Sequence, residues 1–122
     1  QQQFKEGCHL DKDNVLSGMV SELRRGTLVL CVLSQLKSPM YGYSLVNTLN
    51  EKGISAEANT LYPLLRRLES QGLLESSWQT DGPKPRKYYQ ATEFGNKICQ
   101  QLKQHWDKTV NSINQIFEEE AK

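Results

Sequence analysis

The sequence predicts a mainly α-helical protein with one small β-hairpin, a fold of the α+β class. Apolar residues recur at helical spacing in three parts of the chain, residues 15–23, 61–68 and 94–117. Such spacing is typical of helices that bury one face. Between the second and third parts, two short stretches with aromatic residues flank the turn-forming segment 81–85, which indicates a hairpin.

The composition is that of one small globular domain. The chain has 122 residues, of which 37% are hydrophobic and 24% are charged, and its mean hydropathy is −0.65. A chain of this size can bury one core, and the composition excludes collagen-like, disulfide-scaffold and fully disordered classes. Because the net charge is only +1, any contact with nucleic acid must depend on where the charges lie.

The chain has three cysteines, Cys8, Cys31 and Cys99. Their number is odd, and no two of them have the spacing of a metal site. This usage is typical of the reducing cytoplasm. We expect no metal and no cofactor, because Cys8 and His9 would supply only two ligands from a polar N-terminal segment. No apolar run approaches the ~20 residues of a membrane helix, and no signal peptide is visible, so we predict a cytoplasmic protein.

The N-terminal part is expected to form an arm and one helix. Residues 1–13 are polar and are predicted to be a mobile arm, with structure beginning near Asn14. Apolar residues up to Leu23 mark one face of a helix, and Gly26 interrupts it. The apolar run that follows predicts a central helix, buried on all sides, that ends at about Ser38.

Two further helices are expected in the middle of the chain. The first runs from Gly42 to Gly53, and the second runs from Ser55, a good N-cap, to Gly72. Helical spacing then defines which sides face the core. The inner faces are expected to consist of Tyr43, Val46, Leu49, Leu61, Leu64, Leu65 and Leu68.

The last part is predicted to be a hairpin followed by a long helix. Strands at 73–80 and 86–92 flank the turn at 81–85, and Thr92 is expected to cap the helix. Apolar residues on this helix are spaced mostly by four, so the stripe rotates along the helix. The stripe consists of Phe94, Ile98, Leu102, Trp106, Val110, Ile113 and Phe117.

This order of elements predicts a winged helix-turn-helix with one helix appended, in which the hairpin is the wing. Opposite its leucines, the third helix carries polar residues suited to a DNA major groove. Pro63 lacks an N–H and leaves the carbonyl of Asn59 without its helical partner, which favours an exposed face. The expected outer face is Asn59, Thr60, Tyr62, Pro63, Arg66, Arg67 and Ser70, and the wing adds the cations Lys84, Arg86 and Lys87.

The last helix is expected to need a partner, because little of its own chain remains to cover its second apolar patch. A C2 homodimer would cover this patch and present two recognition helices about 34–36 Å apart. We therefore divide the chain into the arm 1–13, a winged helix-turn-helix domain 14–92 and a dimerisation helix 93–122. The expected interface is Val15, Met19, Leu102, Trp106, Val110, Ile113 and Phe117.

Five motifs stand out in the chain, namely Glu22–Thr27, Tyr41–Tyr43, Thr60–Glu69, Gly72–Leu74 and Pro85–Tyr89. Together they resemble the PadR family of transcriptional regulators, in particular its small subfamily with one C-terminal helix, which includes multidrug-sensing repressors. The similarity extends from about Val15 to Phe117. One departure is Asn59, where the family often has glycine, so the operator sequence is expected to differ.

The resemblance implies a homodimer that represses transcription by binding a pseudo-palindromic DNA operator. In some drug-sensing members an aromatic residue of the last helix stacks on planar ligands, and Trp106 is at a similar place. Packing in the dimer core is the alternative role for Trp106. The DNA-contact set, partly carried over from the family, is Tyr41, Asn59, Thr60, Tyr62, Pro63, Arg66, Lys84, Arg86 and Lys87.

Two other functions stay open at this point. A winged-helix module for protein–protein contacts without DNA is suggested by the near-neutral charge, and the cationic wing argues against it. A small-molecule-binding protein with incidental DNA contact is a third hypothesis, centred on Trp106. Enzyme chemistry finds no support, because the sequence has no Ser/His/Asp grouping, no phosphate-binding glycine loop and no paired carboxylates.

Overall fold

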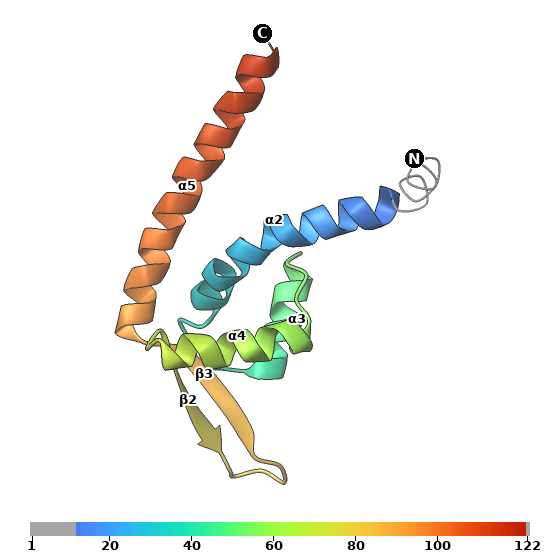
Figure 1. Ribbon diagram of the computed structural model, residues 1–122. Helices are drawn as coiled ribbons and strands as arrows, with labels where there is room; N and C mark the ends of the chain where they lie inside the picture. The colour runs from blue at the N-terminus through green and yellow to red at the C-terminus, as the bar shows by residue number, and fades with distance from the viewer. Residues whose placement is uncertain (1–11, 122) are drawn as a thin grey trace.

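The computed structural model describes residues 12–121, in which the elements follow in the order α2, β1, α3, α4, β2, β3 and α5. Figure 1 shows α2, α3 and α4 grouped at the centre, with the β2–β3 hairpin and the far end of α5 extending in opposite directions. Helices with one small antiparallel sheet confirm the predicted fold class. Cys8, His9 and most of the predicted arm lie outside the described residues.

Helix α2 (Lys12–Gln35) is continuous, so the predicted interruption at Gly26 is wrong. Gly26 is exposed, and a glycine inside a helix costs only about 0.5–1 kcal/mol relative to alanine. The helix begins two residues before Asn14 and ends at Gln35 rather than at Ser38. Its central segment is buried on one side only. Leu28, Val32 and Leu33 are buried, while Val29, Leu30 and Cys31 are half-buried.

A strand that the sequence did not predict, β1 (Met40–Tyr41), precedes α3 (Gly42–Glu51). Two residues are too few to show the alternation by which a strand is recognised. Strand β1 pairs with β3 (Arg86–Ala91), which also pairs with β2 (Leu74–Gln79). The expected hairpin is therefore part of a three-stranded antiparallel sheet of order β1-β3-β2.

Helix α4 (Ala58–Ser70) does not start at the predicted cap, Ser55. Its N-cap is Glu57, which makes no side-chain capping bond. The side chain of Asn50 fixes the preceding loop instead. Its amide nitrogen donates to the carbonyl of Ala56 over 2.8 Å, and its oxygen accepts from the N–H of Ala56 over 3.2 Å. The local sequence favoured a cap at Ser55. Because Asn50 holds this loop in a non-helical conformation, the helix begins only at Ala58.

Helix α5 (Glu93–Ala121) begins with the predicted cap. The Thr92 hydroxyl accepts from the N–H of Gly95 over 2.9 Å and donates to the carbonyl of Gly72 over 2.7 Å. Gly95 lies so close to the carbonyl of Leu73 that a Cβ atom at this position would overlap it. The first turn of α5 is thereby fixed to the base of the wing.

The core lies where α2, α3, α4 and the base of the sheet meet. It continues along α5 only to Cys99, beyond which no described residue of α5 is buried, and this helix extends away from the rest of the chain (Figure 1). Within residues 12–121 no helix is long and apolar enough to cross a membrane. The most completely buried side chains are Val32, Leu33, Leu36, Leu45, Leu49, Leu61, Leu65 and Leu68.

Candidate nucleic-acid interface

The outer face of α4 has the composition that its helical spacing predicts. Asn59, Thr60, Pro63 and Arg66 are exposed. On the opposite side Leu61, Leu65 and Leu68 are buried and Leu64 is half-buried. Pro63 lies inside the helix on this exposed side, where water or a ligand can satisfy the carbonyl that it leaves unpaired. An exposed helical face of this kind fits a major groove.

Tyr62 differs from its neighbours because it is half-buried at the edge of this face. Its ring lies against Gly42, where α3 begins, so closely that a Cβ atom on Gly42 would overlap the ring. The glycine therefore allows α3 and α4 to approach each other. Tyr62 contributes to this packing as well as to the surface.

Arg86 lies over a stack of tyrosines on one side of the wing. Its guanidinium carbon is 5.1 Å from the ring centre of Tyr41 and 5.8 Å from that of Tyr43. A guanidinium nitrogen of Arg86 donates a hydrogen bond to the Tyr43 hydroxyl over 3.3 Å. The ring of Tyr41 stacks on Tyr43 and on Tyr88, with centres 5.9 and 4.2 Å apart. Cation–π contacts and stacking thus orient the guanidinium before any ligand is present.

The hydroxyl groups of Tyr41 and Tyr88 meet at the side-chain oxygen of Gln79 on β2. Tyr41 lies within hydrogen-bonding distance of Gln79, at 3.0 Å, and of the Tyr88 hydroxyl, at 2.9 Å. Tyr88 also donates to Gln79. The hydrogen bond with Tyr41 raises the pKa of Tyr88 above its ordinary value, with smaller contributions from burial and from the charge of Tyr41. Tyr88 is therefore a neutral donor at physiological pH.

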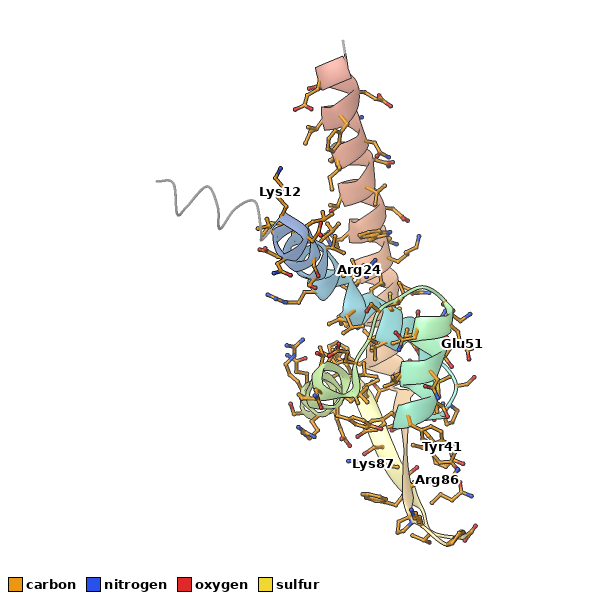
Figure 2. The ribbon with its side chains drawn as sticks, turned by 90° about the vertical axis from the view of Figure 1, so that its right-hand side faces the viewer. Lys12, Arg24, Tyr41, Glu51, Arg86 and Lys87 are labelled. Atoms are coloured by element: carbon orange, nitrogen blue, oxygen red, sulfur yellow. The ribbon has the colours of Figure 1, made fainter. Side chains whose placement is uncertain are left out.

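Lys87 lies on the other side of the wing, toward α4. Its ammonium is 3.8 Å from a carboxylate oxygen of Glu69, and it lies 5.8 Å from the ring centre of Trp78 and 5.4 Å from that of Tyr89. Glu69 also accepts a hydrogen bond from Ser76 of β2. Figure 2 shows Lys87 on the α4 side of the wing, and Arg86 and Tyr41 on the opposite side.

The third predicted wing cation, Lys84, is exposed in the turn between β2 and β3. Among the described residues, no acidic side chain lies within 4 Å of Lys84, Arg66 or Arg86. Within the part of the chain that the structure describes, these three cations therefore have no acidic partner at this distance, whereas Glu69 partly balances the charge of Lys87. The predicted cations thus belong to three different places on the surface.

Sequence reasoning missed four residues of this surface, Tyr43, Glu69, Trp78 and Gln79. Tyr43 was expected on the inner face of α3, but it is 51% exposed, because Gly42, Leu45 and Leu49 form the buried side. Gln79 and Glu69 join the surface only through contacts with distant parts of the chain. Alternation along β2 and β3 is the one sequence pattern that could have separated the two faces of the wing.

The residues predicted for a dimer interface form an apolar surface on α2 and α5. Val15 and Met19 are both 57% exposed, Phe117 is 65% exposed, and Trp106 and Ile113 are 41% and 42% exposed. Leu102 and Val110 are half-buried, and Leu102 packs against the core of its own chain. Three more exposed residues extend this surface, namely Leu16, Leu23 and Ile116.

Trp106 is one of the residues that line a cavity of about 610 Å³ between α2 and α5. Cys31 and Cys99 also line the cavity, and burial raises the pKa of the Cys31 thiol, with a smaller contribution from Cys99. The side-chain oxygen of Asn96, another lining residue, is buried and has no hydrogen-bond partner in the described residues. No group of three or more potential metal ligands occurs in residues 12–121.

These elements define a winged-helix protein with an exposed recognition-type helix and a cationic wing. Comparison with known proteins agrees with this class. The model of the transcriptional regulator PadR-like family matches residues 29–108. A PadR family transcriptional regulator from Eggerthella lenta, known from a crystal structure, is 51% identical, with 89% of this chain and 97% of that chain covered and a TM-score of 0.85.

Two other relatives are more distant. A transcriptional regulator of Mycobacterium tuberculosis is 33% identical over 75 residues, which are 61% of this chain and 70% of that protein. Bacillus subtilis PadR, solved in complex with operator DNA, is 25% identical, with 62% of this chain and 45% of that chain covered and a TM-score of 0.58. The chain belongs to the PadR-like family of transcriptional regulators, which confirms the family that its motifs predict. This is a family of regulators, not of enzymes.

Proposed function

We propose that this protein is a transcriptional repressor that binds a pseudo-palindromic DNA operator as a homodimer. The observation that carries the proposal is the outer face of α4, where Asn59, Thr60 and Arg66 are exposed beside a wing that holds Arg86 in place. A helix with such a face can contact base edges in the major groove, while the wing contacts the backbone or the adjacent minor groove. Such a regulator acts on DNA in the cytoplasm.

Local charge supports DNA as the partner despite the net charge of +1. Arg66 and Lys84 are exposed, and Arg86 is exposed on the tyrosine stack. Phosphate contacts of this kind fix the position of a protein on DNA, and base contacts then provide specificity. A complex of a relative, Bacillus subtilis PadR, with operator DNA supports the same partner for this chain.

The homodimer is supported by the apolar surface of α2 and α5. Several large apolar side chains there are more than half exposed, including Val15, Met19 and Phe117. Large apolar side chains exposed in such number are unfavourable in water and are typical of an interface. A C2 dimer would cover it and would set two copies of α4 at the spacing of two half-sites.

A planar aromatic effector is the proposed ligand of the cavity beside Trp106. Trp106 is 41% exposed, and the cavity has both apolar and polar lining residues. Packing in the dimer core is the alternative role of this residue. If the ligand stacks on Trp106, a planar dye should quench tryptophan emission in the wild type but not in Trp106→Ala. Quenching that survives this substitution would exclude the site.

The first experiment measures binding of labelled DNA by fluorescence anisotropy at several salt concentrations. The DNA upstream of the protein's own gene is compared with a scrambled duplex of the same length. Preferential binding whose logarithm falls linearly with the logarithm of salt concentration supports the proposal, and the slope reports the number of phosphates neutralised. If neither duplex binds at low salt, the protein–protein interaction function becomes the better explanation.

A further inference from the structure

We propose that Trp78 of the wing contacts the DNA backbone, in a groove between α4 and the wing that receives one DNA strand. This proposal rests on the proposed DNA-binding function and adds a residue outside the predicted contact set. It follows from where the indole ring lies, what covers it and which charges flank it.

Trp78 lies on the side of the wing that faces α4. It is paired across the strands with Lys87, and the next pair on the same face is Ser76 with Tyr89. Ser76 and Lys87 both contact Glu69 of α4, by a hydrogen bond and an ion pair respectively. The face that carries Trp78 is therefore turned toward α4, as the position of Lys87 in Figure 2 also shows.

Trp78 is 63% exposed, whereas Tyr89 on the same face is only 4% exposed. The helix thus covers the base of this face and leaves its outer part open. The only described cation over the indole ring is Lys87, whose ammonium is 5.8 Å from the ring centre. In such an arrangement the exposed ring can pack on an apolar sugar face, and the cation above it can bind the adjoining phosphate.

The other wall of the groove is one stripe of α4. At 100° per residue, Tyr62, Arg66 and Glu69 lie along the same side of the helix, and the contacts of Glu69 show that this side faces the wing. A cavity of about 260 Å³ lies between Tyr62, its one lining residue from α4, and the wing residues Trp78 and Lys87. The rest of its lining is Tyr41, Gly42, Tyr43, Pro85, Arg86 and Tyr89. Arg66 is exposed on this same stripe of the helix.

A DNA strand matches these two walls chemically. When α4 lies in the major groove and the wing reaches the next minor groove, the strand between the grooves passes through this space. Its phosphates would meet Arg66 and Lys87, and an apolar deoxyribose face would pack on the indole of Trp78. In the free protein the ion pair between Lys87 and Glu69 is long, at 3.8 Å. A phosphate can therefore replace Glu69 as the partner of Lys87.

The test uses the whole protein and a labelled, mixed-sequence DNA duplex at low ionic strength, because a backbone contact does not depend on base sequence. Anisotropy of the label reports how much DNA is bound, and acrylamide quenching reports how accessible the two tryptophans are. We expect bound DNA to reduce quenching in the wild type. The reduction should persist in Ser77→Ala, a control on the opposite face of β2, and should be absent in Trp78→Phe, where only Trp106 emits.

Affinity provides the second measurement. Trp78→Ala should bind the duplex roughly three- to tenfold more weakly than the wild type, and Ser77→Ala should bind within about twofold of it. Unchanged quenching in DNA-bound wild type, protection that persists in Trp78→Phe, or equal affinities would overturn the proposal while leaving DNA binding established. A wild type that binds no DNA would overturn the proposed function, and this contact with it.

Discussion

Arg86 and Lys87 are neighbours in sequence, yet they have different surroundings because side chains alternate across a strand. Arg86 lies on the tyrosine stack of Tyr41 and Tyr43, with no described acid within 4 Å, and is held in an orientation suited to a phosphate. Lys87 faces α4, where Glu69 balances part of its charge. Two cations of one motif can therefore contribute unequally to DNA binding.

Arg66→Ala tests the central contact of α4 at the scale of one side chain. If the guanidinium binds a base edge, operator binding should weaken by about 1–3 kcal/mol, and specificity at one position should relax. Anisotropy with operator and scrambled duplexes measures both effects, and Lys103→Ala, which removes a charge paired with Asp107 on α5, is the control. An equal loss on every duplex would indicate a phosphate contact, and unchanged affinity would exclude Arg66 from the interface.

Tyr88 should make stability depend on alkaline pH. The hydrogen bond with Tyr41 raises the pKa of Tyr88 in the folded protein, so the folded state holds the phenolic proton more tightly than the unfolded state does. This contribution is complete below the unfolded pKa, about 10, and is lost as pH rises through the higher folded pKa. Urea unfolding should show a fall in the free energy of unfolding above about pH 10. The fall should be smaller in Tyr88→Phe, and an equal fall in both proteins would contradict the prediction.

At the scale of elements, the junction between the wing and α5 depends on close backbone contact. The Thr92 hydroxyl bridges the first turn of α5 and the carbonyl of Gly72, and Gly95 lies directly against the carbonyl of Leu73. These contacts fix the direction in which α5 leaves the core. A small change at this junction would therefore be transmitted along α5.

Gly95→Ala should destabilise the protein by about 1–3 kcal/mol, because the added methyl group overlaps a backbone carbonyl that cannot rotate away. The matched control is Gly18→Ala in α2, where no atom lies within 4 Å of the added group. That change should instead stabilise the helix by about 0.5–1 kcal/mol. Urea unfolding measures both free energies. Similar effects of the two substitutions would show that α5 does not approach Leu73 closely.

At the scale of the whole molecule, α2 and α5 contact each other near the core and diverge beyond it (Figure 1). Each then presents apolar side chains that its own chain does not cover, among them Met19 on α2 and Ile113 on α5. This arrangement leaves a surface that a second copy would complete. The proposed dimer therefore depends on the angle between two helices as well as on their sequences.

Ile113→Asp should weaken the dimer by at least about tenfold, because a carboxylate would be buried without a partner. Gln115→Glu adds the same charge on the opposite side of α5 and is the control. Sedimentation velocity over a range of concentrations measures the monomer–dimer equilibrium. Affinity for an operator with two half-sites should fall in parallel. A dimer of unchanged stability in Ile113→Asp would place the interface elsewhere.

Strong local patterns predicted most of the fold. The leucine spacing located the buried face of α4, the turn at 81–85 located the wing, and Thr92 marked the start of α5. The predicted helix boundaries were wrong where contacts with other parts of the chain outweighed local sequence preference. Gly26 lies within a continuous helix, and Asn50 fixes a loop that moves the start of α4 past Ser55.

For the candidate DNA-binding surface, the sequence predicted which residues are exposed but not which residues contact them. Sequence located the exposed face of α4 and the wing cations, because helical periodicity and turn residues are local properties. It did not locate the partners Tyr43, Glu69 and Gln79, since their contacts join residues up to 43 positions apart. Sequence alone therefore determined which elements form and which side chains are available, through local periodicity and backbone preference. Only the tertiary structure decided which cation is held by tyrosines and which by an acid, because these contacts exist only after distant strands and helices have packed.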